Sequence, residues 1–227
     1  MWLYNFGLSL YAFAIALVSP WHRKAKRWRD GRKHLLQRMA EAIDPSEPIV
    51  WVHVASLGEF EQGRPIIEKI RLEHPRYKIL LTFFSPSGYE IRKDYPGADY
   101  IFYLPIDTPR NARRFLDIVR PEIAIFVKYE FWINLLTGLR RRGIRTYIVS
   151  AIFRRNSVFF RQWGGLWRQA LETFDTLFVQ NEESRILLGK LGFDNVVVAG
   201  DTRFDRVAQI AANAKRIELV ERFRGGE

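Results

Sequence analysis

From residue 49 onward, short apolar runs alternate with longer amphipathic stretches. The first run, residues 49–55, consists mostly of β-branched and aromatic residues after a Pro-containing turn, which is typical of a buried strand. Later runs of the same character are residues 78–84, 100–104, 122–128, 145–150, 176–179 and 195–198. Helix-length stretches separate them: residues 59–73, a segment from residue 87, and residues 108–119, 131–142, 159–173 and 182–191. This alternation predicts an α/β fold with a doubly wound parallel sheet.

The N-terminal segment has a different pattern. Residues 2–20 carry no charge and are close to the length that crosses a bilayer, and a dense basic cluster follows over residues 23–33. A cleavable signal peptide carries its basic residues before the apolar run. The order here therefore favours an uncleaved membrane-anchor helix, residues 1–21, with its basic flank on the cytoplasmic side. Two alternatives stay open: a shallow insertion into one membrane face, and a helix buried in the protein, which Asn5, Gly7 and Ser9 would suit.

Residues 22–48 are expected to form a basic juxtamembrane helix, amphipathic over residues 32–42, and a linker that ends in a Pro-Ser-Glu-Pro turn. The net charge of +11 implies an anionic partner. Much of the basic excess lies beside the apolar N-terminal segment, and no nucleic-acid-binding motif is present. We therefore expect an anionic membrane surface as the partner, and no nucleic acid.

Several classes of chemistry are excluded or disfavoured by what the sequence lacks. It has no Cys, so disulfides, thiolate metal sites and Cys nucleophiles are excluded. Its four His residues form no ligand-spaced pair, which disfavours a His-based metal site. No G-x-G-x-x-G fingerprint follows the first strand, and neither a P-loop nor a G-x-S-x-G elbow occurs, which disfavours a dinucleotide enzyme, an NTPase or a serine hydrolase.

Polar residues follow the first predicted strand at the point where it ends. Ser56 and Gly58 lie in the turn, and Glu59 lies in the first turn of the next helix. The carboxyl ends of parallel strands meet at one edge of a sheet, which is where ligands bind in such folds. The helix dipole favours a carboxylate at this position and keeps it ionised. The simplest interpretation is that Glu59 supports the helix start, and the second is that it acts as a base in a cleft.

Three other strand ends repeat this arrangement. Ser85 and Ser87, with Gly88, open a helix whose first amides could hold a phosphate or sugar oxygen, although a Ser at this place is more simply an N-cap. Lys128 and Glu130 end the fourth strand and form either a site or an ordinary solvated strand end. Residues 200–205 follow the last strand and could equally be a turn and a helix cap. Four such ends on one sheet edge favour a shared cleft.

These strand ends resemble the sequence motifs of one enzyme family, the 3-deoxy-D-manno-octulosonic acid (Kdo) transferases of lipopolysaccharide synthesis. Residues 53–59, HVASLGE, resemble the signature H-A-x-S-x-G-E, and residues 83–88, FFSPSG, resemble T-x-T-x-T/S-G. Residues 130–132, EFW, are similar to part of E-x-E-L-W-P, and residues 200–205, GDTRFD, resemble G-N-x-K-[FY]-D. The order and spacing agree, and the resemblance covers essentially the whole chain.

The resemblance implies a Rossmann-like domain that forms the N-terminal half of a GT-B glycosyltransferase. Such an enzyme would transfer Kdo from CMP-Kdo to a lipid A precursor (lipid IVA) at the cytoplasmic face of the bacterial inner membrane, without a metal or cofactor. The general base of the family matches Glu59, and two residues that stabilise its transition state match Glu130 and Arg203. The implied substrate-binding residues are Ser56, Gly58, Ser85, Ser87, Gly88, Lys128 and Arg154.

The sequence also departs from the family pattern. Lys128 stands where the E-x-E-L-W-P motif has its first Glu, Ile133 stands at its Pro, and Arg203 replaces the Lys of G-N-x-K. The N-A-R-x-S segment of the family is matched only loosely, by residues 150–157. Residues 49–205 are expected to be the acceptor domain, and residues 206–227 the start of a connection to a donor-binding domain. The alternative function is a membrane-tethered module that binds anionic lipid without catalysis.

Overall fold

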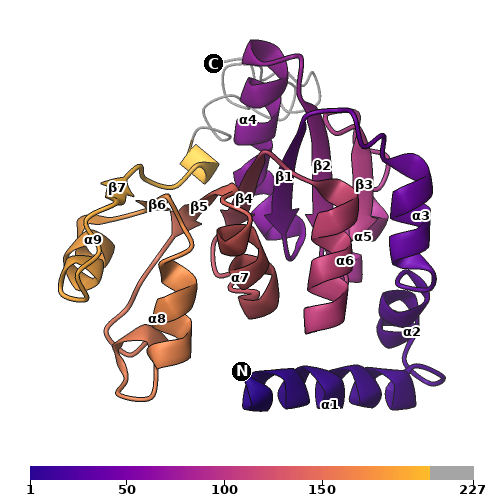
Figure 1. Cartoon of the computed structure of the whole chain (residues 1–227), viewed down its shortest axis with the longest axis horizontal. Coiled ribbons are helices and arrows are strands. Elements are labelled where there is room, and N and C mark those ends of the chain that lie inside the picture. Colours follow the sequence, from indigo (N-terminus) through magenta and orange to yellow (C-terminus); the bar gives the residue numbers. More distant parts are fainter. Residues whose placement is uncertain (205–227) are drawn as a thin grey trace, which may run out of the picture.

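A seven-stranded parallel sheet forms the centre of the protein. The computed structural model describes residues 1–204, and Figure 1 shows the sheet among its helices. The strands are β1 (Ile49–Val54), β2 (Lys78–Phe83), β3 (Tyr100–Tyr103), β4 (Ile123–Val127), β5 (Arg145–Ala151), β6 (Thr176–Val179) and β7 (Val196–Val198). Their order is β3-β2-β1-β4-β5-β6-β7, and every neighbouring pair is parallel. The predicted doubly wound α/β sheet is confirmed, and its strand order reverses between β1 and β4.

Helices cover both faces of the sheet. The helices that follow β1 and β2 are α4 (Leu57–Glu73) and α5 (Pro86–Arg92). The helices after β3, β4 and β6 are α6 (Pro109–Val119), α7 (Ile133–Arg141) and α9 (Glu182–Gly189). Two apolar cores result: α4 packs on one face of the sheet, and α6 and α7 pack on the other. Because both faces are covered, the central strands are apolar on both sides, as their continuous hydrophobic runs predict.

The side chains of β1 alternate between the two apolar cores. Ile49 and Trp51 point into the core beneath α6 and α7, whereas Val50, Val52 and Val54 point into the core beneath α4. All six residues of the strand are buried. The one polar side chain among them, His53, therefore needs a partner inside the protein.

One predicted helix is discontinuous. Residues 159–173 fold as a short 3₁₀ turn, η1 (Val158–Phe160), and a separate helix, α8 (Gly165–Leu171). The loop between them turns tightly at Gly164, where a Cβ atom would lie 2.1 Å from the carbonyl oxygen of Val158. The continuous apolar pattern hides this break because both pieces still bury apolar side chains against the same core.

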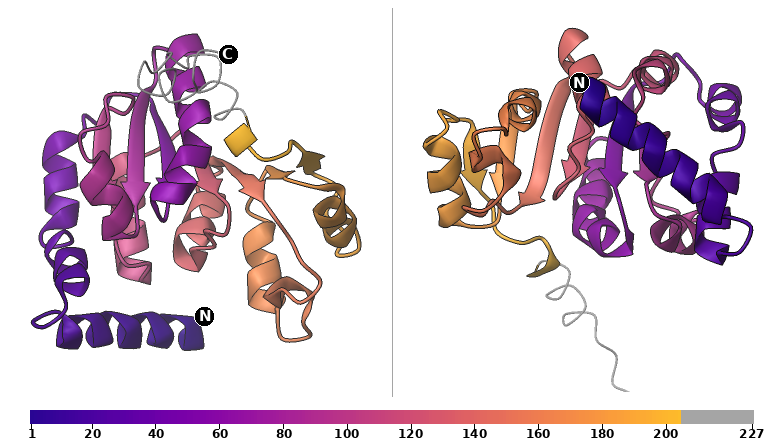
Figure 2. Two further views of the ribbon diagram at one scale, coloured as in Figure 1. Left: turned by 180° about the vertical axis from the view of Figure 1, so that it is seen from behind. Right: turned by 90° about the horizontal axis from the view of Figure 1, so that it is seen from below.

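The N-terminal region contains three helices, α1 (Trp2–Val18), α2 (Arg23–Asp30) and α3 (Leu35–Ala42). The amphipathic helix predicted over residues 32–42 begins later, at Leu35, because His34 adopts a left-handed backbone conformation with φ of 51°. Seen from below in Figure 2, α1 crosses the domain diagonally and leads into α2. Within residues 1–204, no helix is long and apolar enough to cross a membrane, so the spanning anchor is not confirmed. Asp205 and the predicted connection, residues 206–227, lie outside the described residues.

Candidate active site at the carboxyl edge of the sheet

The carboxyl ends of the strands meet at the side of the domain that α1 covers in part. Tyr11 of α1 stacks on Phe84, which follows β2, with ring centroids 6.2 Å apart. Tyr4 of α1 accepts a hydrogen bond from the backbone N–H of Ile133, which follows β4 (3.3 Å). The predicted shared edge therefore exists, and it lies beside the N-terminal helix.

Glu59 closes the N-terminus of α4. Its Oε2 accepts hydrogen bonds from the backbone N–H groups of Ala55 (2.7 Å) and Ser56 (3.0 Å), and the Ser56 hydroxyl lies 3.4 Å away. A Glu at the third helical position that reaches back to the N-cap is half of a capping box. The simplest sequence interpretation is thus confirmed: Glu59 supports the helix start. Because these contacts use only Oε2, the other carboxylate oxygen, Oε1, stays available to accept a hydrogen bond or a proton.

The electrostatic environment of Glu59 differs from the prediction. The helix dipole was expected to keep this carboxyl ionised, but burial raises its pKa, and the nearby negative charge of Glu130 raises it further. The two backbone hydrogen bonds and His53 act in the opposite direction and are outweighed. The reason is that the half-buried carboxyl loses hydration and faces a second carboxylate. A raised pKa makes Glu59 a stronger base than an ordinary glutamate.

Glu130 is buried and is held by two aromatic residues with ring nitrogens. His53 Nε2 lies 3.0 Å from Glu130 Oε2, and Trp132 Nε1 donates to the same oxygen at 2.8 Å. The solvated strand end that the sequence left open is therefore excluded for Glu130, whose exposed fraction is 8%. The ring contacts leave its other oxygen without a recorded partner among residues 1–204.

A second layer of polar atoms orients His53. Its Nδ1 lies 2.9 Å from the hydroxyl oxygen of Thr82, which also accepts a hydrogen bond from Trp51 Nε1 (2.8 Å). His53 Nδ1 also lies 3.1 Å from the carbonyl oxygen of Thr82, and Trp132 Nε1 lies 3.0 Å from His53 Nε2, so both ring nitrogens have partners in either tautomer. The chain of hydrogen bonds from Trp51 to Glu130 is buried throughout, so it fixes the position of the Glu130 carboxylate.

Sequence reasoning placed His53 and Trp132 in the family motifs but did not count them among the site residues. His53 belongs to the first motif and Trp132 to the third, and the structure joins the two across the β1–β4 pair. The available signal was a lone His inside an otherwise apolar strand, since a buried imidazole needs a polar partner.

The second strand end is a helix cap. Ser85 Oγ accepts a weak hydrogen bond from the Ser87 N–H (3.4 Å) and lies 2.9 Å from the Ser87 hydroxyl. Gly88 is required by packing, because a Cβ atom there would lie 2.5 Å from the Phe83 ring and 3.1 Å from the Leu57 nitrogen. These contacts confirm the N-cap interpretation, and they bring β2, α4 and α5 together directly beside Glu59. A substrate-binding role for the three residues stays a prediction, as it does for Gly58, which is exposed and has open space around its Cα.

The two predicted cations that follow β4 and β5 have no side-chain partner among residues 1–204. Lys128 is half-buried and adopts a left-handed backbone conformation with φ of 67°. Such a conformation is uncommon for a residue other than glycine and is often found at functional sites. Arg154 is exposed, and only its backbone is engaged, by Ser157. Both cations are therefore available to an anion.

Arg203 lies apart from the acidic pair. It is exposed and forms an ion pair with Asp201, its Nε donating to Asp201 Oδ2 at 2.8 Å. The segment is fastened to α4, because Gln62 Nε2 donates to Asp201 Oδ1 (2.9 Å) and Thr202 donates to the Gln62 carbonyl (2.8 Å). The fold thus brings this last motif to within one helical turn of Glu59 along α4, without a recorded contact to Glu59 or Glu130.

The described part of the chain contains no group of three or more His, Asp or Glu side chains that could hold a metal ion. What the edge offers instead is a buried, oriented carboxylate, a second carboxyl with a raised pKa, and unpaired cations.

The fold and site define a Rossmann-like α/β domain of the GT-B kind, with an acidic pair at the switch point of its sheet. In solved structures the same fold makes up half of UDP-GlcNAc 2-epimerases. The Neisseria meningitidis structure, bound to UDP-GlcNAc, has a TM-score of 0.56 and 14% identity, covering 73% of this chain and 50% of that chain. The Methanocaldococcus jannaschii structure has a TM-score of 0.55 and 16% identity, covering 77% of this chain and 52% of that chain. At these identities the likeness shows the fold alone.

Sequence comparison shows the family. Residues 26–206 match the family model described as 3-deoxy-D-manno-octulosonic-acid transferase (kdotransferase), so the chain belongs to this family of transferases. The Kdo transferase of Bordetella pertussis is 29% identical over 88% of this chain and 50% of its own length. That of Aquifex aeolicus is 29% identical over 81% of this chain and 47% of its own length. The chain thus spans about half the length of these curated relatives.

Proposed function

We propose that the chain is the acceptor half of a Kdo transferase, which transfers Kdo from CMP-Kdo to a lipid A precursor of the lipid IVA type. The donor would bind a second domain that follows residue 205, and no metal or cofactor would take part. The proposal is carried by one observation: in a chain of this family, Glu59 and Glu130 lie near one another at the carboxyl edge, and the charge of Glu130 raises the pKa of Glu59.

In the proposed reaction, a hydroxyl oxygen of the acceptor attacks the anomeric carbon of Kdo. The new carbon–oxygen bond forms as the bond between that carbon and the phosphate oxygen of CMP breaks. The hydroxyl proton passes to the carboxylate of Glu59, and CMP leaves with the electron pair as an anion. The oxygen of Glu59 that is free of the helix cap is the proton acceptor, and its raised basicity favours the transfer.

Glu130 and Arg203 would act on charges that develop during this step. Positive charge grows at the anomeric carbon as the leaving group departs, and a fixed carboxylate stabilises it without reorganising. His53 and Trp132 supply that fixation. Arg203 would offset the negative charge of CMP. Because Asp201 holds the Arg203 guanidinium in this structure, the donor phosphate would have to share or replace that carboxylate.

The proposed place of this reaction is the cytoplasmic face of the bacterial inner membrane, where an acyl-chain acceptor is available. Ser56, Ser85 and Ser87, which line the same edge, would contact the acceptor, and Lys128 and Arg154 would contact its phosphates. The alternative is a module that binds anionic lipid without catalysis, and such a module would not need the oriented Glu59–Glu130 pair.

The test is Glu59→Gln, assayed for Kdo transfer from CMP-Kdo to lipid IVA in the form of the protein that includes the donor domain. Gln preserves the helix cap, because its side-chain oxygen can accept the same hydrogen bonds. Loss of a general base lowers turnover by about 10²–10⁴-fold. Glu73→Gln at the other end of α4 is the matched control, since Glu73 is exposed and its one recorded partner within residues 1–204, Lys69, lies 3.8 Å away. Turnover by Glu59→Gln equal to that of the control would remove Glu59 from the base role.

A further inference from the structure

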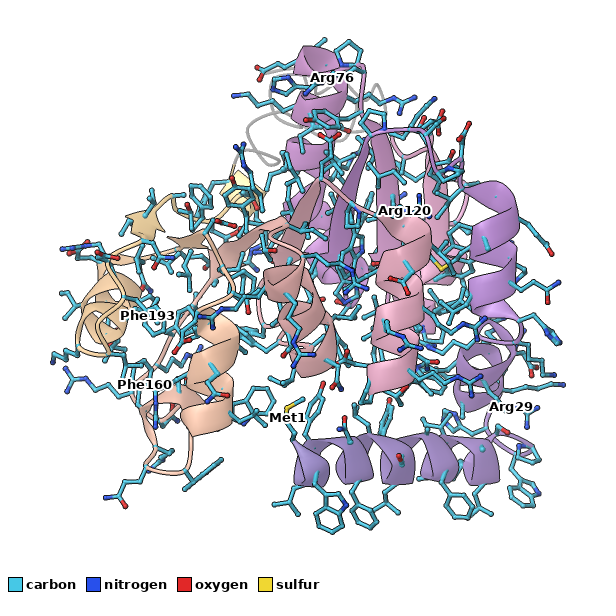
Figure 3. All side chains as sticks on the ribbon, viewed as in Figure 1. Met1, Arg29, Arg76, Arg120, Phe160 and Phe193 are labelled. Atoms are coloured by element: carbon cyan, nitrogen blue, oxygen red, sulfur yellow. The ribbon has the colours of Figure 1, made fainter. Side chains whose placement is uncertain are left out.

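Helix α1 carries no charged side chain, and the domain covers only one side of it. The side chains that face the domain recur at helical spacing, at Tyr4, Leu8, Ala12 and Ile15, and are partly buried. The opposite side exposes large apolar residues: Trp2, Leu3, Phe6, Leu10, Phe13 and Leu17. In Figure 3, several aromatic side chains of α1 point away from the sheet. Large apolar side chains that gather on one exposed face mark a surface that binds a partner or a membrane.

Polar side chains fix α1 against the domain along its length. The Tyr4 hydroxyl donates to Asp107 Oδ2 (2.7 Å), and the Asn134 amide donates to Asn5 Oδ1 (2.8 Å). At the other end, Arg29 of α2 donates to the hydroxyl of Ser19 (2.6 Å). Because both ends are held, the helix axis runs along the surface of the domain. A helix that spanned a bilayer would have to break the contacts at one end at least.

A basic pocket lies beside the first turn of α1, between α6 and α7. It has a volume of about 630 Å³, and its charged lining is four arginines without any carboxylate: Arg110, Arg113, Arg141 and Arg142. Met1 and Asn5 of the α1 region also line it. Arg142 is paired with Asp117, but the other three have no side-chain partner among residues 1–204. Within the described residues, three unpaired arginines in a pocket that no carboxylate lines favour a phosphate group as the occupant.

The other end of α1 carries the same combination of aromatic and basic residues. Trp21, which is 83% exposed, lines a second pocket with Arg23, Lys24 and Arg27. A tryptophan next to cations is the usual composition at the level of lipid headgroups. Cations therefore flank the apolar face of α1 at both ends.

We propose that α1 lies in the plane of an anionic bilayer surface. Its outward face is buried at the boundary between headgroups and acyl chains, and a lipid phosphate occupies the arginine pocket between α6 and α7. The domain replaces the polar face that an isolated interfacial helix would need. This inference goes beyond the transfer reaction and does not rest on it, because binding to vesicles can be measured without a sugar donor.

The orientation of α1 is tested by depth measurements. The sequence has no Cys, so single cysteines can be introduced by Leu3→Cys, Leu10→Cys and Leu17→Cys and labelled with a nitroxide. These positions are seven residues apart, face the same way, and extend over about 21 Å along the helix. On vesicles that contain phosphatidylglycerol, collision with oxygen and with a nickel chelate should give the same depth for all three labels. A label at position 10 that lies much deeper than those at positions 3 and 17 would show a spanning helix and overturn the proposal.

The arginine pocket is tested by charge removal with a matched control. Arg110→Gln/Arg113→Gln removes two charges from the pocket, and Arg76→Gln/Arg120→Gln removes two that lie away from α1, as Figure 3 shows. In flotation with phosphatidylglycerol-containing vesicles, the pocket variant should bind about thirtyfold more weakly, and the control within about twofold of the parent. Equal losses in both variants would remove the pocket from the interface.

Two more outcomes decide between occupants of the apolar face. The parent protein should bind pure phosphatidylcholine vesicles much more weakly, because the attraction between its basic residues and anionic headgroups is then lost. If the protein does not float with either vesicle type, and light scattering shows a dimer that Leu10→Ser dissociates, a second copy of the chain covers α1 and the proposal is wrong.

Discussion

At the scale of single residues, Glu59 and Glu130 show how a fold can give two carboxyl groups different environments. Glu59 is half-buried and shares one oxygen with a helix cap, whereas Glu130 is buried and held by His53 and Trp132. Such a separation of environments commonly marks acid–base sites.

The first prediction concerns the pKa of Glu59. Burial and the charge of Glu130 raise it, so Glu59 should ionise above the usual range of a glutamate. Glu130→Gln removes the second cause and should lower the pKa of Glu59, while the effect of burial remains. Carboxyl carbon NMR of the chain gives both values without an activity assay. An unchanged pKa in Glu130→Gln would mean that the two carboxyls do not interact.

If Glu59 is the base, as proposed, its pKa also sets the pH dependence of transfer. Glu59 can accept a proton only when it is ionised, so the rate should fall as the pH falls through its raised pKa. The acid limb of the rate profile should therefore coincide with the NMR titration of Glu59.

The second prediction concerns His53. His53→Leu takes one hydrogen-bond partner from the buried carboxylate of Glu130 and should lower the free energy of unfolding by about 1–3 kcal/mol. His74→Leu is the control and should stay within about 0.5 kcal/mol, because His74 is exposed at the end of α4. Urea denaturation measures both.

A double variant separates this pairing from simple packing. His53→Leu/Glu130→Leu removes both polar partners, and removing both can be nearly neutral. The double variant should therefore be more stable than the sum of the two single losses predicts. Additive losses would show that His53 and Glu130 do not stabilise one another.

At the scale of the elements, Asp107 joins three parts of the protein. Its carboxylate accepts hydrogen bonds from Tyr4 of α1 and from the backbone N–H groups of Asn134 and Leu135 in α7, although it lies in the loop before α6. Burial raises the pKa of Asp107 to about 7, and the hydrogen bonds from Tyr4, Asn134 and Leu135 only partly oppose the shift.

The third prediction follows from the sign of that shift. Because the folded pKa lies above the unfolded value of 3.8, the native state holds a proton that the unfolded state releases, and stability falls as the pH rises between these values. Asp107→Asn cannot titrate. Relative to it, the wild type should lose about 1.4 kcal/mol of unfolding free energy per pH unit in this window. Contributions from Glu59 and other groups are common to both proteins and cancel in the difference. Parallel stability profiles would place the Asp107 pKa near its ordinary value.

At the scale of the whole molecule, the described domain brings Glu59, Glu130 and Arg203 to one edge but holds Arg203 on Asp201. The relatives are about twice as long as this chain. Under the proposed function, the donor domain would supply the remaining contacts of the site.

The fourth prediction is that Kdo transfer from CMP-Kdo depends on that domain. This chain alone should show no transfer, and the form extended by the downstream coding region should be active. Activity of the short form would place the donor site within these residues or across an oligomer. Loss of activity in both forms, with vesicle binding retained, would favour the lipid-binding module.

The sequence by itself determined the elements and their order. Alternating apolar runs located the seven strands to within one or two residues. The central strands are buried on both faces and must be continuously apolar, and the partly exposed β3 and β7 keep β-branched or aromatic residues. It also determined which residues lie at the strand ends, since the carboxyl ends of parallel strands share one edge, and the motifs at those ends pointed to the family that the comparison confirmed.

Only the tertiary structure decided how those residues interact. The pairing of His53 with Glu130 joins residues 77 positions apart, and the raised pKa of Glu59 depends on burial that its place in a first helical turn does not reveal. The same holds for α1. Its composition allowed a spanning, a surface or a buried helix, and contacts with Asp107 and Asn134, more than a hundred residues away, set its direction along the domain. The hydropathy of α1 shows that the segment avoids water, whereas its position depends on the side chains that the fold places against it.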